Sequence, residues 1–135
     1  MKVVIVGCGR IGAAVAGVLS PRHDVAVVDW NPGSFGRLRP NFEGETVIGN
    51  GIDSDTLHEA GVAHADIVLA LTDGDNRNLM TAQVARQMGA KDVLARVYDP
   101  ERAQIFADLG VTTFSPTVIG AQRLFDLTLG DREGA

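Results

Sequence analysis

Three glycines near the amino terminus have the spacing of a phosphate-binding turn. They stand in the segment Gly7-Cys8-Gly9-Arg10-Ile11-Gly12, directly after the apolar run Val3–Val6. Between a strand and a helix, the first glycine makes the turn, the second lets a pyrophosphate approach, and the third lets the helix pack closely. The N–H groups that begin the helix attract an anion. We therefore expect residues 7–12 to bind phosphate.

An acidic residue stands where such a turn needs one. Asp29 ends the apolar run Val25–Val28, seventeen residues after the last glycine, and its carboxylate can hold both hydroxyls of a ribose. It also repels a 2′-phosphate, and Trp30 follows rather than an arginine, so NADP is disfavoured while NAD, ADP and ATP remain open. Arg37 and Arg39 could reverse this preference, although we expect both to be solvated. In the weaker interpretation, the glycines only form a tight turn and Asp29 only caps the strand.

These residues need a fold that brings strand ends together, and the rest of the sequence predicts one. Short runs rich in β-branched residues recur, nearly continuous rather than alternating, as in strands buried on both faces. They are Val3–Val6, Val25–Val28, Thr46–Ile48, Ile67–Leu71, Val93–Val97 and Val111–Phe114. Alternation of strand and helix predicts right-handed crossovers. We expect an α/β, Rossmann-like doubly wound sheet of six parallel strands with helices on both faces.

Capping residues mark the helices between these strands. The expected helices are Ile11–Leu19, a short one capped at 53–55 and ended by Gly61, Asn76–Met88, and one running from Asp99-Pro100 to Gly110. The helix after the second strand is the weakest, because two prolines and two glycines interrupt residues 32–40. A leucine-rich solenoid is rejected, because no segment repeats its consensus.

Composition indicates one soluble domain. The 135 residues are 45% hydrophobic, and the net charge of −5 argues against a nucleic-acid partner. The single cysteine excludes an internal disulfide, and no apolar run is long enough to span a bilayer, so we expect a cytoplasmic protein. We expect a nucleotide-binding domain at 1–116, a C-terminal helix at 117–129 and a polar tail at 130–135.

The remaining polar candidates are weaker. Cys8 lies in the glycine turn, but the sequence places no histidine or acid to activate it, so a buried thiol is expected. The three histidines lack metal-ligand spacing and are expected on the surface. Asp73 and Asp75 follow the fourth strand and are expected to be solvated. Arg96 differs, because a charge late in an apolar strand needs a partner, which a phosphate or a carboxylate would supply.

The sequence resembles the RCK N-lobe (KTN or TrkA-N domain) of Trk/Ktr-type potassium-transport regulatory subunits. The resemblance covers Lys2 to Leu124 and is carried by the glycine segment with its internal Arg10, Val27-Val28-Asp29, Gly49-Asn50-Gly51, Ala70-Leu71-Thr72 with Asn78-Leu79, Ala95-Arg96-Val97, and Leu109-Gly110-Val111 before Ser115-Pro116. It implies a regulatory subunit that gates a potassium channel or transporter, not an enzyme. The implied ligand is NAD/NADH or ADP/ATP.

The resemblance also implies which residues bind. The implied cofactor-binding set is Gly7, Cys8, Gly9, Arg10, Ile11, Gly12, Asp29, Trp30, Asn50, Gly51, Ile52, Leu71, Thr72, Asp73 and Arg96. The glycines and Arg10 would meet the phosphates, residues 50–52 the adenine, and Thr72 with Arg96 the phosphate or nicotinamide side. In the family, the arginine matching Arg10 can reach a nucleotide held by the neighbouring subunit.

At two positions the sequence departs from the family pattern. Asn50 replaces an Asp common in relatives, and Thr117 replaces a Glu with which some relatives bind a divalent cation, so no metal site is expected. The family's C-terminal lobe is absent, so we expect either a minimal form or a truncated one. The resemblance further implies a homodimer, and a larger ring, attached to the inner face of the membrane through the channel partner.

Two alternatives remain open, and the last helix has two interpretations. A small NAD-dependent oxidoreductase, or its cofactor half, fits the turn and Asp29 equally well. Against it, 135 residues leave no substrate domain, and no Tyr/Lys, His/Asp or Cys/His pair supplies a proton relay. A structural domain with a degenerate pocket is the third option. The apolar residues of 117–129 exceed one stripe, so the helix either fills a groove of its own domain or buries Phe125 and Leu129 against a second subunit.

Overall fold

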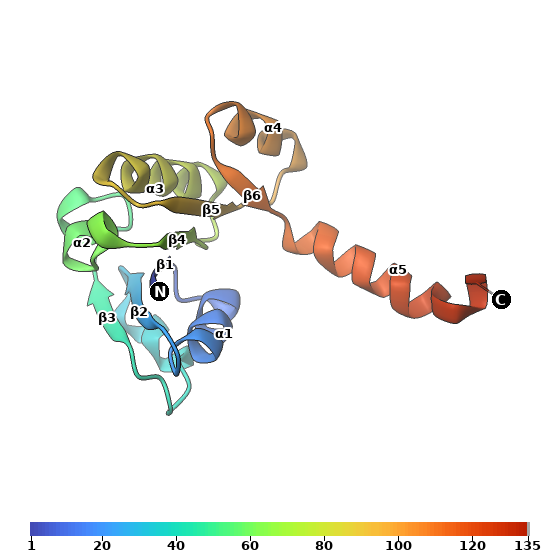
Figure 1. Cartoon of the computed structure of the whole chain (residues 1–135), viewed down its shortest axis with the longest axis horizontal. Coiled ribbons are helices and arrows are strands. Elements are labelled where there is room, and N and C mark those ends of the chain that lie inside the picture. The colour runs from blue at the N-terminus through green and yellow to red at the C-terminus, as the bar shows by residue number, and fades with distance from the viewer. Residues whose placement is uncertain (135) are drawn as a thin grey trace.

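The computed structural model describes the backbone of residues 1–134 and the side chains of residues 1–130. Six strands form one parallel sheet in the order β3-β2-β1-β4-β5-β6 (Figure 1). Their bounds are β1 Lys2–Val6, β2 Asp24–Asp29, β3 Glu45–Ile48, β4 Ile67–Ala70, β5 Asp92–Arg96 and β6 Thr112–Phe114. Each predicted apolar run overlaps one of these strands, so the predicted six-stranded parallel sheet is confirmed.

The strand order reverses at the centre of the sheet. From β1 the chain moves outward through β2 to β3, then returns to the other side of β1 and continues from β4 to β6. Val6 at the end of β1 is level with Val28 in β2 and with Ala70 in β4. The three segments that follow these residues therefore leave the same edge of the sheet, where a doubly wound fold binds its ligands.

Helices cover both faces of the sheet. One face carries α1 (Arg10–Leu19) and the 3₁₀ helix η1 (Pro32–Arg37), while the other carries α2 (Ser54–Glu59), η2 (Val62–His64), α3 (Asp75–Met88) and α4 (Pro100–Asp108). The segment predicted as the weakest helix forms only η1, as its prolines and glycines indicated. Asp53 and Asp99 cap α2 and α4, each accepting a hydrogen bond from the backbone N–H two residues on.

The central strand is buried from both sides. Val3 and Ile5 pack toward α1, whereas Val4 and Val6 pack toward α3, and all four are at most 2% exposed. This pattern explains why the predicted strands are continuous apolar runs rather than alternating ones. Packing on both faces therefore fixes the position of the residues at the carboxyl edge of the sheet.

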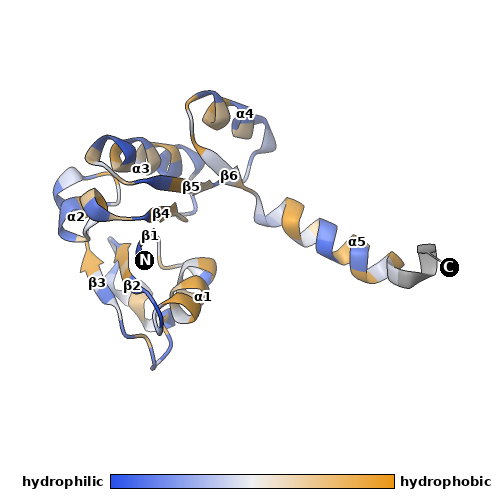
Figure 2. Ribbon diagram, viewed as in Figure 1, coloured by the Kyte–Doolittle hydropathy of each residue, from blue (hydrophilic) through white to orange (hydrophobic). Residues whose placement is uncertain are grey.

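The last helix, α5 (Pro116–Gly134), leaves the sheet after β6 and extends away from the rest of the molecule (Figure 1). Its hydrophobic residues are spread along it (Figure 2), and Val118, Ile119, Leu124, Phe125 and Leu127 are 52–66% exposed. Of the two interpretations of this helix, the one in which it fills a groove of its own domain is therefore wrong, because nothing else in the described chain covers these side chains. The surface that covers the apolar side chains of a helix can belong to another chain.

Two further observations concern the end of the chain and the membrane. The backbone of α5 leaves helical geometry at Gly130, where a positive φ of 39° suits a glycine. The side chains of the expected polar tail beyond Gly130 lie outside the described residues. None of the helices in the described chain is long and apolar enough to cross a bilayer.

Candidate functional site

A cleft of about 520 Å³ lies at the carboxyl ends of the central strands. Most of the predicted site residues line it, namely Gly7, Cys8, Gly9, Asp29, Trp30, Asn50, Gly51, Ile52, Leu71, Thr72, Asp73 and Arg96. The structure adds Val6, Val28, Asn31, Ser34, Arg37, Gly49 and Arg77. The cleft therefore lies at the edge of the sheet where the sequence predicted ligand binding.

The three glycines of the turn do different work. Gly7 has a positive φ of 110°, and a Cβ there would lie 2.9 Å from the backbone between Leu71 and Thr72. A Cβ on Gly12 would lie 2.0 Å from the carbonyl oxygen of Gly7. A Cβ on Gly9 would meet nothing within 4 Å. Gly7 and Gly12 thus allow close backbone packing, whereas Gly9 keeps the surface beside the cleft free, as expected for a residue that phosphates approach.

Arg10, Ile11 and Gly12 do not line the cleft. The first turn of α1 carries them away from it. Gly12 is buried beneath the turn, and Ile11 packs against the core on the α1 face. Arg10 is exposed beside a second, shallower depression, which it borders together with Ala13, Ala14, Arg37 and Arg39.

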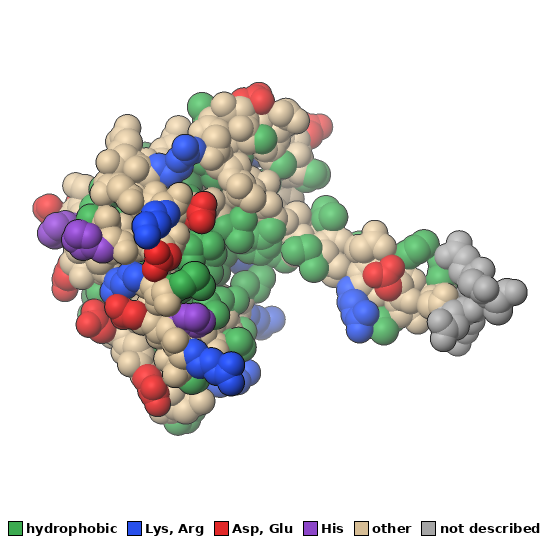
Figure 3. Space-filling view, in the orientation of Figure 1, with side chains coloured by type: hydrophobic (Ala, Val, Ile, Leu, Met, Phe, Trp, Pro, Cys, Tyr) green, Lys and Arg blue, Asp and Glu red, His purple; other side chains and the backbone are tan. Residues whose placement is uncertain are grey.

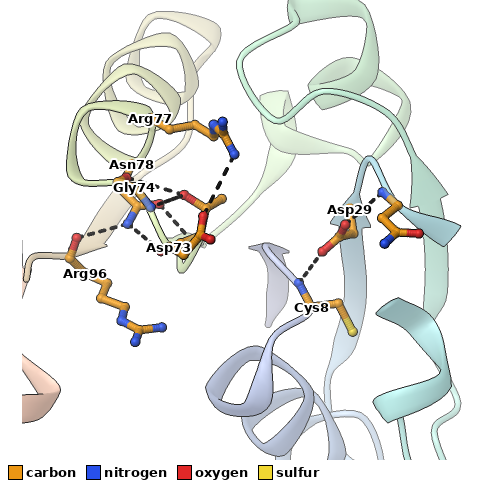
Figure 4. A network of polar contacts seen from close by, with 9 residues as sticks. Cys8, Asp29, Asp73, Gly74, Arg77, Asn78 and Arg96 are labelled. Atoms are coloured by element: carbon orange, nitrogen blue, oxygen red, sulfur yellow. Dashed lines mark hydrogen bonds and ion pairs between the residues drawn. The ribbon is translucent and has the colours of Figure 1, made fainter. Parts of the chain in front are cut away.

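Asp29 joins the glycine turn to the end of β2 (Figure 4). Its Oδ2 accepts a hydrogen bond from the Cys8 N–H at 2.9 Å, and its Oδ1 accepts one from the Asn31 N–H, also at 2.9 Å. Each carboxylate oxygen can accept a further hydrogen bond, so the hydroxyls of a ribose remain possible donors. Asp29 therefore shapes the site and can also contact a ligand.

Cys8 has the environment expected of a structural thiol. Its side chain is fully buried, and both burial and the neighbouring Asp29 carboxylate raise the pKa of the thiol, although Arg37 opposes this rise. The thiol is therefore protonated at neutral pH and is a poor nucleophile. The prediction of a small buried thiol is confirmed.

Arg37 lines the cleft, although it was expected to be solvated. Its Nη1 donates to the Cys8 carbonyl oxygen at 3.4 Å, while Asn31 and Ser34 line the cleft beside it. Although exposed, Arg37 is not simply solvated, because the short η1 turns the chain back toward β1. The clustering of polar residues directly after Asp29 was the available signal.

The opposite side of the cleft is organised around Asn78 (Figure 4). The Asn78 side chain is fully buried and bonds both Thr72, which follows β4, and the carbonyl oxygen of Arg96 at the end of β5. The Arg96 guanidinium lies over the Tyr98 ring, 4.2 Å from its centroid. The buried Nε of Arg96 has no hydrogen-bond partner in the described part of the chain. The predicted need of Arg96 for a partner is thus met only partly.

The two acidic residues after β4 differ, because Asp73 is exposed and Asp75 is buried. Asp73 is exposed, as expected, and its carboxylate lies 4.0 Å from the Arg77 guanidinium. Asp75 is only 7% exposed and accepts hydrogen bonds from the Tyr98 N–H at 2.7 Å and the Asp99 N–H at 3.0 Å. The expectation that Asp75 is solvated is wrong, because the β5–α4 connection lies against the first turn of α3.

The turn after β3 closes the cleft on its third side. The Asn50 side chain accepts a hydrogen bond from the Ile52 N–H at 3.1 Å, and the buried Thr81 hydroxyl donates to the Gly51 carbonyl at 2.9 Å. A Cβ on Gly51 would lie 2.3 Å from Val6 Cγ1, so this turn packs directly on β1. Within the described residues, no group of three His, Cys, Asp or Glu side chains is arranged to hold a metal ion.

The sheet order and the position of the cleft define a Rossmann-like domain. The family model of the TrkA-N domain matches residues 3–116, and the chain belongs to this family. It is 49% identical over 115 residues to the Trk system potassium uptake protein TrkA of Streptomyces coelicolor, covering 84% of this chain and 52% of that protein. The chain thus spans about half the length of that relative.

Solved structures share the fold. The Kef CTD of Shewanella denitrificans in its AMP-bound form superposes with a TM-score of 0.79 at 24% identity, over 96% of this chain and 81% of that chain. The GsuK channel bound to NAD superposes with a TM-score of 0.71 at 23% identity, over 85% of this chain and 21% of that chain. At these identities the likeness shows the fold alone.

Proposed function

We propose that the domain binds an adenine nucleotide, NAD/NADH or ADP/ATP, and thereby regulates a membrane potassium-uptake system. The observation that carries the proposal is the cleft itself. It has open space at Gly9, spare acceptor capacity on Asp29 and an unpaired donor on Arg96 among the described residues. The relative that is 49% identical, a potassium uptake protein, supports the transport role, and the AMP- and NAD-bound neighbours support the ligand class.

The ligand would lie across the carboxyl edge of the sheet. Asp29 would accept hydrogen bonds from the ribose, and the turn at 7–9 would face the first phosphate. Asn50, Gly51 and Ile52 would flank the adenine. Thr72 and Arg96 would face the group attached beyond that phosphate. Negative charge at Asp29 disfavours the 2′-phosphate of NADP. Arg37 lines the cleft but donates to the Cys8 carbonyl oxygen, so we propose the unphosphorylated nucleotides.

The proposed role is regulation rather than catalysis. A regulator needs only different affinities for its nucleotide in two conformations. A hydride-transferring enzyme would in addition need a group that moves a proton beside the nicotinamide. The buried, protonated Cys8 does not favour that role. The domain would act at the inner face of the membrane, bound to a potassium-channel subunit.

Assembly through α5 is part of the proposal. We propose residues 1–116 as the nucleotide-binding unit and residues 117–129 as the helix that pairs two copies. Half-exposed apolar side chains along α5 usually mark an interface, and hydrophobic side chains also gather on the domain beside its start (Figure 3). Arg10, exposed and outside its own cleft, is free to reach a nucleotide held by a neighbouring subunit.

Light scattering tests the assembly. The unmodified chain should be a dimer or larger at micromolar concentration, and Phe125→Asp, which puts a charge on a half-exposed position of α5, should give a folded monomer that still binds nucleotide. Arg123→Asp, on the opposite side of the same helix, is the matched control and should leave the assembly unchanged. An unmodified chain that is monomeric would contradict the interface.

Calorimetric titration with NAD, NADH, ADP and ATP tests the binding. A nucleotide at 100 times its Kd should stabilise the fold by about 2.7 kcal/mol. Trp30, the single tryptophan, lies at the cleft and is 72% exposed, so its fluorescence gives an independent readout. Flat titrations with all four would overturn nucleotide binding, and steady oxidation of NADH by carbonyl acceptors would overturn the regulatory role.

A further inference from the structure

Asn78 lies outside the cleft, yet its side chain bonds two residues that line it. Its Oδ1 accepts hydrogen bonds from the Thr72 N–H at 2.9 Å and the Thr72 hydroxyl at 2.6 Å. Its Nδ2 donates to the carbonyl oxygens of Thr72 and Arg96, both at 3.0 Å. An amide side chain has two donors and two acceptor positions, so Asn78 uses its full capacity here.

We infer that Asn78 is a positioning residue of the nucleotide site. It holds Thr72 and Arg96 where they can contact the part of the ligand beyond its first phosphate. The inference rests on the proposed function. It concerns the β4–β5 side of the cleft only, because each of the four bonds ends on a residue of that side.

Thr72 depends on this contact for its position. Its other side-chain hydrogen bonds, both to Gly74, are long at 3.4 Å. The peptide that joins Leu71 to Thr72 lies where a Cβ on Gly7 would approach within 2.9 Å. A small shift of Thr72 would therefore change the space directly beside the glycine turn, where the second phosphate of a nucleotide would lie.

Arg96 is set in two places. Asn78 holds its carbonyl oxygen, and its guanidinium lies over Tyr98, whose own N–H is held by the buried Asp75. Asn78 and Asp75 both belong to α3. The start of one helix thus fixes both the backbone and the aromatic support of Arg96, whose buried Nε is unpaired within the described chain.

The chemistry of the amide makes a sharp test available. Asn78→Asp keeps the size and the acceptor of the side chain but removes both donors and sets a carboxylate against two carbonyl oxygens. Asn78→Ser removes most of the side chain and leaves room for water. Asn76→Asp is the matched control, since Asn76 is an exposed residue of α3 whose Oδ1 accepts from Arg102, a bond that a carboxylate retains.

AMP and ADP are the probes, titrated calorimetrically below the melting temperature of each variant. AMP should contact the turn and Asp29, whereas the second phosphate of ADP should reach Thr72 and Arg96. We expect Asn78→Asp to weaken ADP about tenfold and AMP less than about threefold, Asn78→Ser to act in the same direction, and Asn76→Asp to change neither.

The ratio of the two losses decides the result, because a purely structural role would weaken both ligands by the same factor. Equal losses, an unchanged ADP affinity, or failure of both Asn78 variants to fold would overturn the inference. If the unmodified chain binds neither AMP nor ADP, the proposed function itself fails. If it binds both and only the selective loss is missing, the proposed function stands without the inference.

Discussion

The two sides of the cleft are built by different means. On the β1–β2 side, the backbone of the turn at 7–9 forms the surface, and Asp29 ties this turn to the end of β2 by accepting a hydrogen bond from the Cys8 N–H. On the β4–β5 side, the surface consists of side chains, above all Arg96 and Arg77, with Thr72 and Arg96 held by the buried Asn78. A contact between distant residues holds each side, but the surface itself is backbone on one side and side chains on the other.

This difference suggests a division of labour in binding. A backbone surface offers the same N–H groups to any phosphate, so it suits the adenosine phosphate that NAD, ADP and ATP share. A side-chain surface can distinguish the groups attached beyond that phosphate. The guanidinium groups of Arg77 and Arg96 lie there with a single exposed carboxylate, that of Asp73. The net positive charge of the three groups favours a further phosphate over a neutral ring. Substitutions at four positions test this division.

The largest effect is expected from Gly12→Ala. The new methyl group would lie 2.0 Å from the carbonyl oxygen of Gly7, a backbone atom that cannot move aside as the end of a flexible side chain could. We expect a loss of about 3 kcal/mol in the free energy of unfolding, measured by urea denaturation. Gly36→Ala, where a Cβ meets nothing within 4 Å, is the control. A variant as stable as the unmodified chain would show that the turn adapts.

The next largest effect is expected from Asp29→Ala. Loss of the carboxylate should weaken nucleotide binding by about 1.5–3 kcal/mol, the range for charge-assisted hydrogen bonds. Because the ribose is common to both ligands, AMP and ADP should lose affinity equally in calorimetry. The domain should also lose some stability, since two backbone N–H groups lose their acceptor. Asp92→Ala, which removes an exposed carboxylate outside the cleft at the start of β5, is the control and should not weaken either ligand.

The contrast between the two sides also explains what could be predicted from the sequence. The glycine turn and Asp29 were found because glycine spacing, and an acid at the end of the second apolar run, are patterns that can be read from the sequence. The strands and caps were found because apolar runs and Asp53 or Asp99 act over a few residues. On the β4–β5 side, Thr72, Asp73 and Arg96 were predicted to line the site, but the buried contacts that position Thr72 and Arg96 were not predicted. Asn78 bonds an oxygen 18 residues away, and Asp75 bonds an N–H 23 residues away. No local pattern distinguishes such residues from solvated ones.

The last helix shows the same limit. Its apolar residues exceed one stripe, which indicates burial, but a helical period does not say against what. The structure places these side chains at half exposure, with Phe125 at 52% and Leu124 at 66%. Whether a helix packs on its own sheet depends on the direction in which the chain leaves β6, and the few residues at 115–116 that set this direction carry no readable signal.

A third, smaller effect separates the roles of the glycines within the first side. Gly9→Ala adds a methyl group where nothing lies within 4 Å, so the melting temperature should not change. The methyl group would occupy the approach of the first phosphate, and we expect AMP and ADP to bind about tenfold more weakly. Unchanged affinity with unchanged stability would show that the phosphate does not pass over Gly9.

The smallest effect is expected from Arg77→Ala, on the β4–β5 side of the cleft. Arg77 is exposed and its ion pair with Asp73 is long at 4.0 Å, so the free energy of unfolding should change by less than about 0.5 kcal/mol. An exposed guanidinium near a phosphate should contribute roughly two- to fivefold in affinity. We expect this loss for ADP and less for AMP, and we expect it to shrink as salt rises, because screening weakens exposed charges. Arg22→Ala removes the same charge outside the cleft and should leave both affinities unchanged in calorimetry. Equal losses in the two variants would mean that net charge, not the position of Arg77 beside the second phosphate, controls binding, and the division between the two sides would fail.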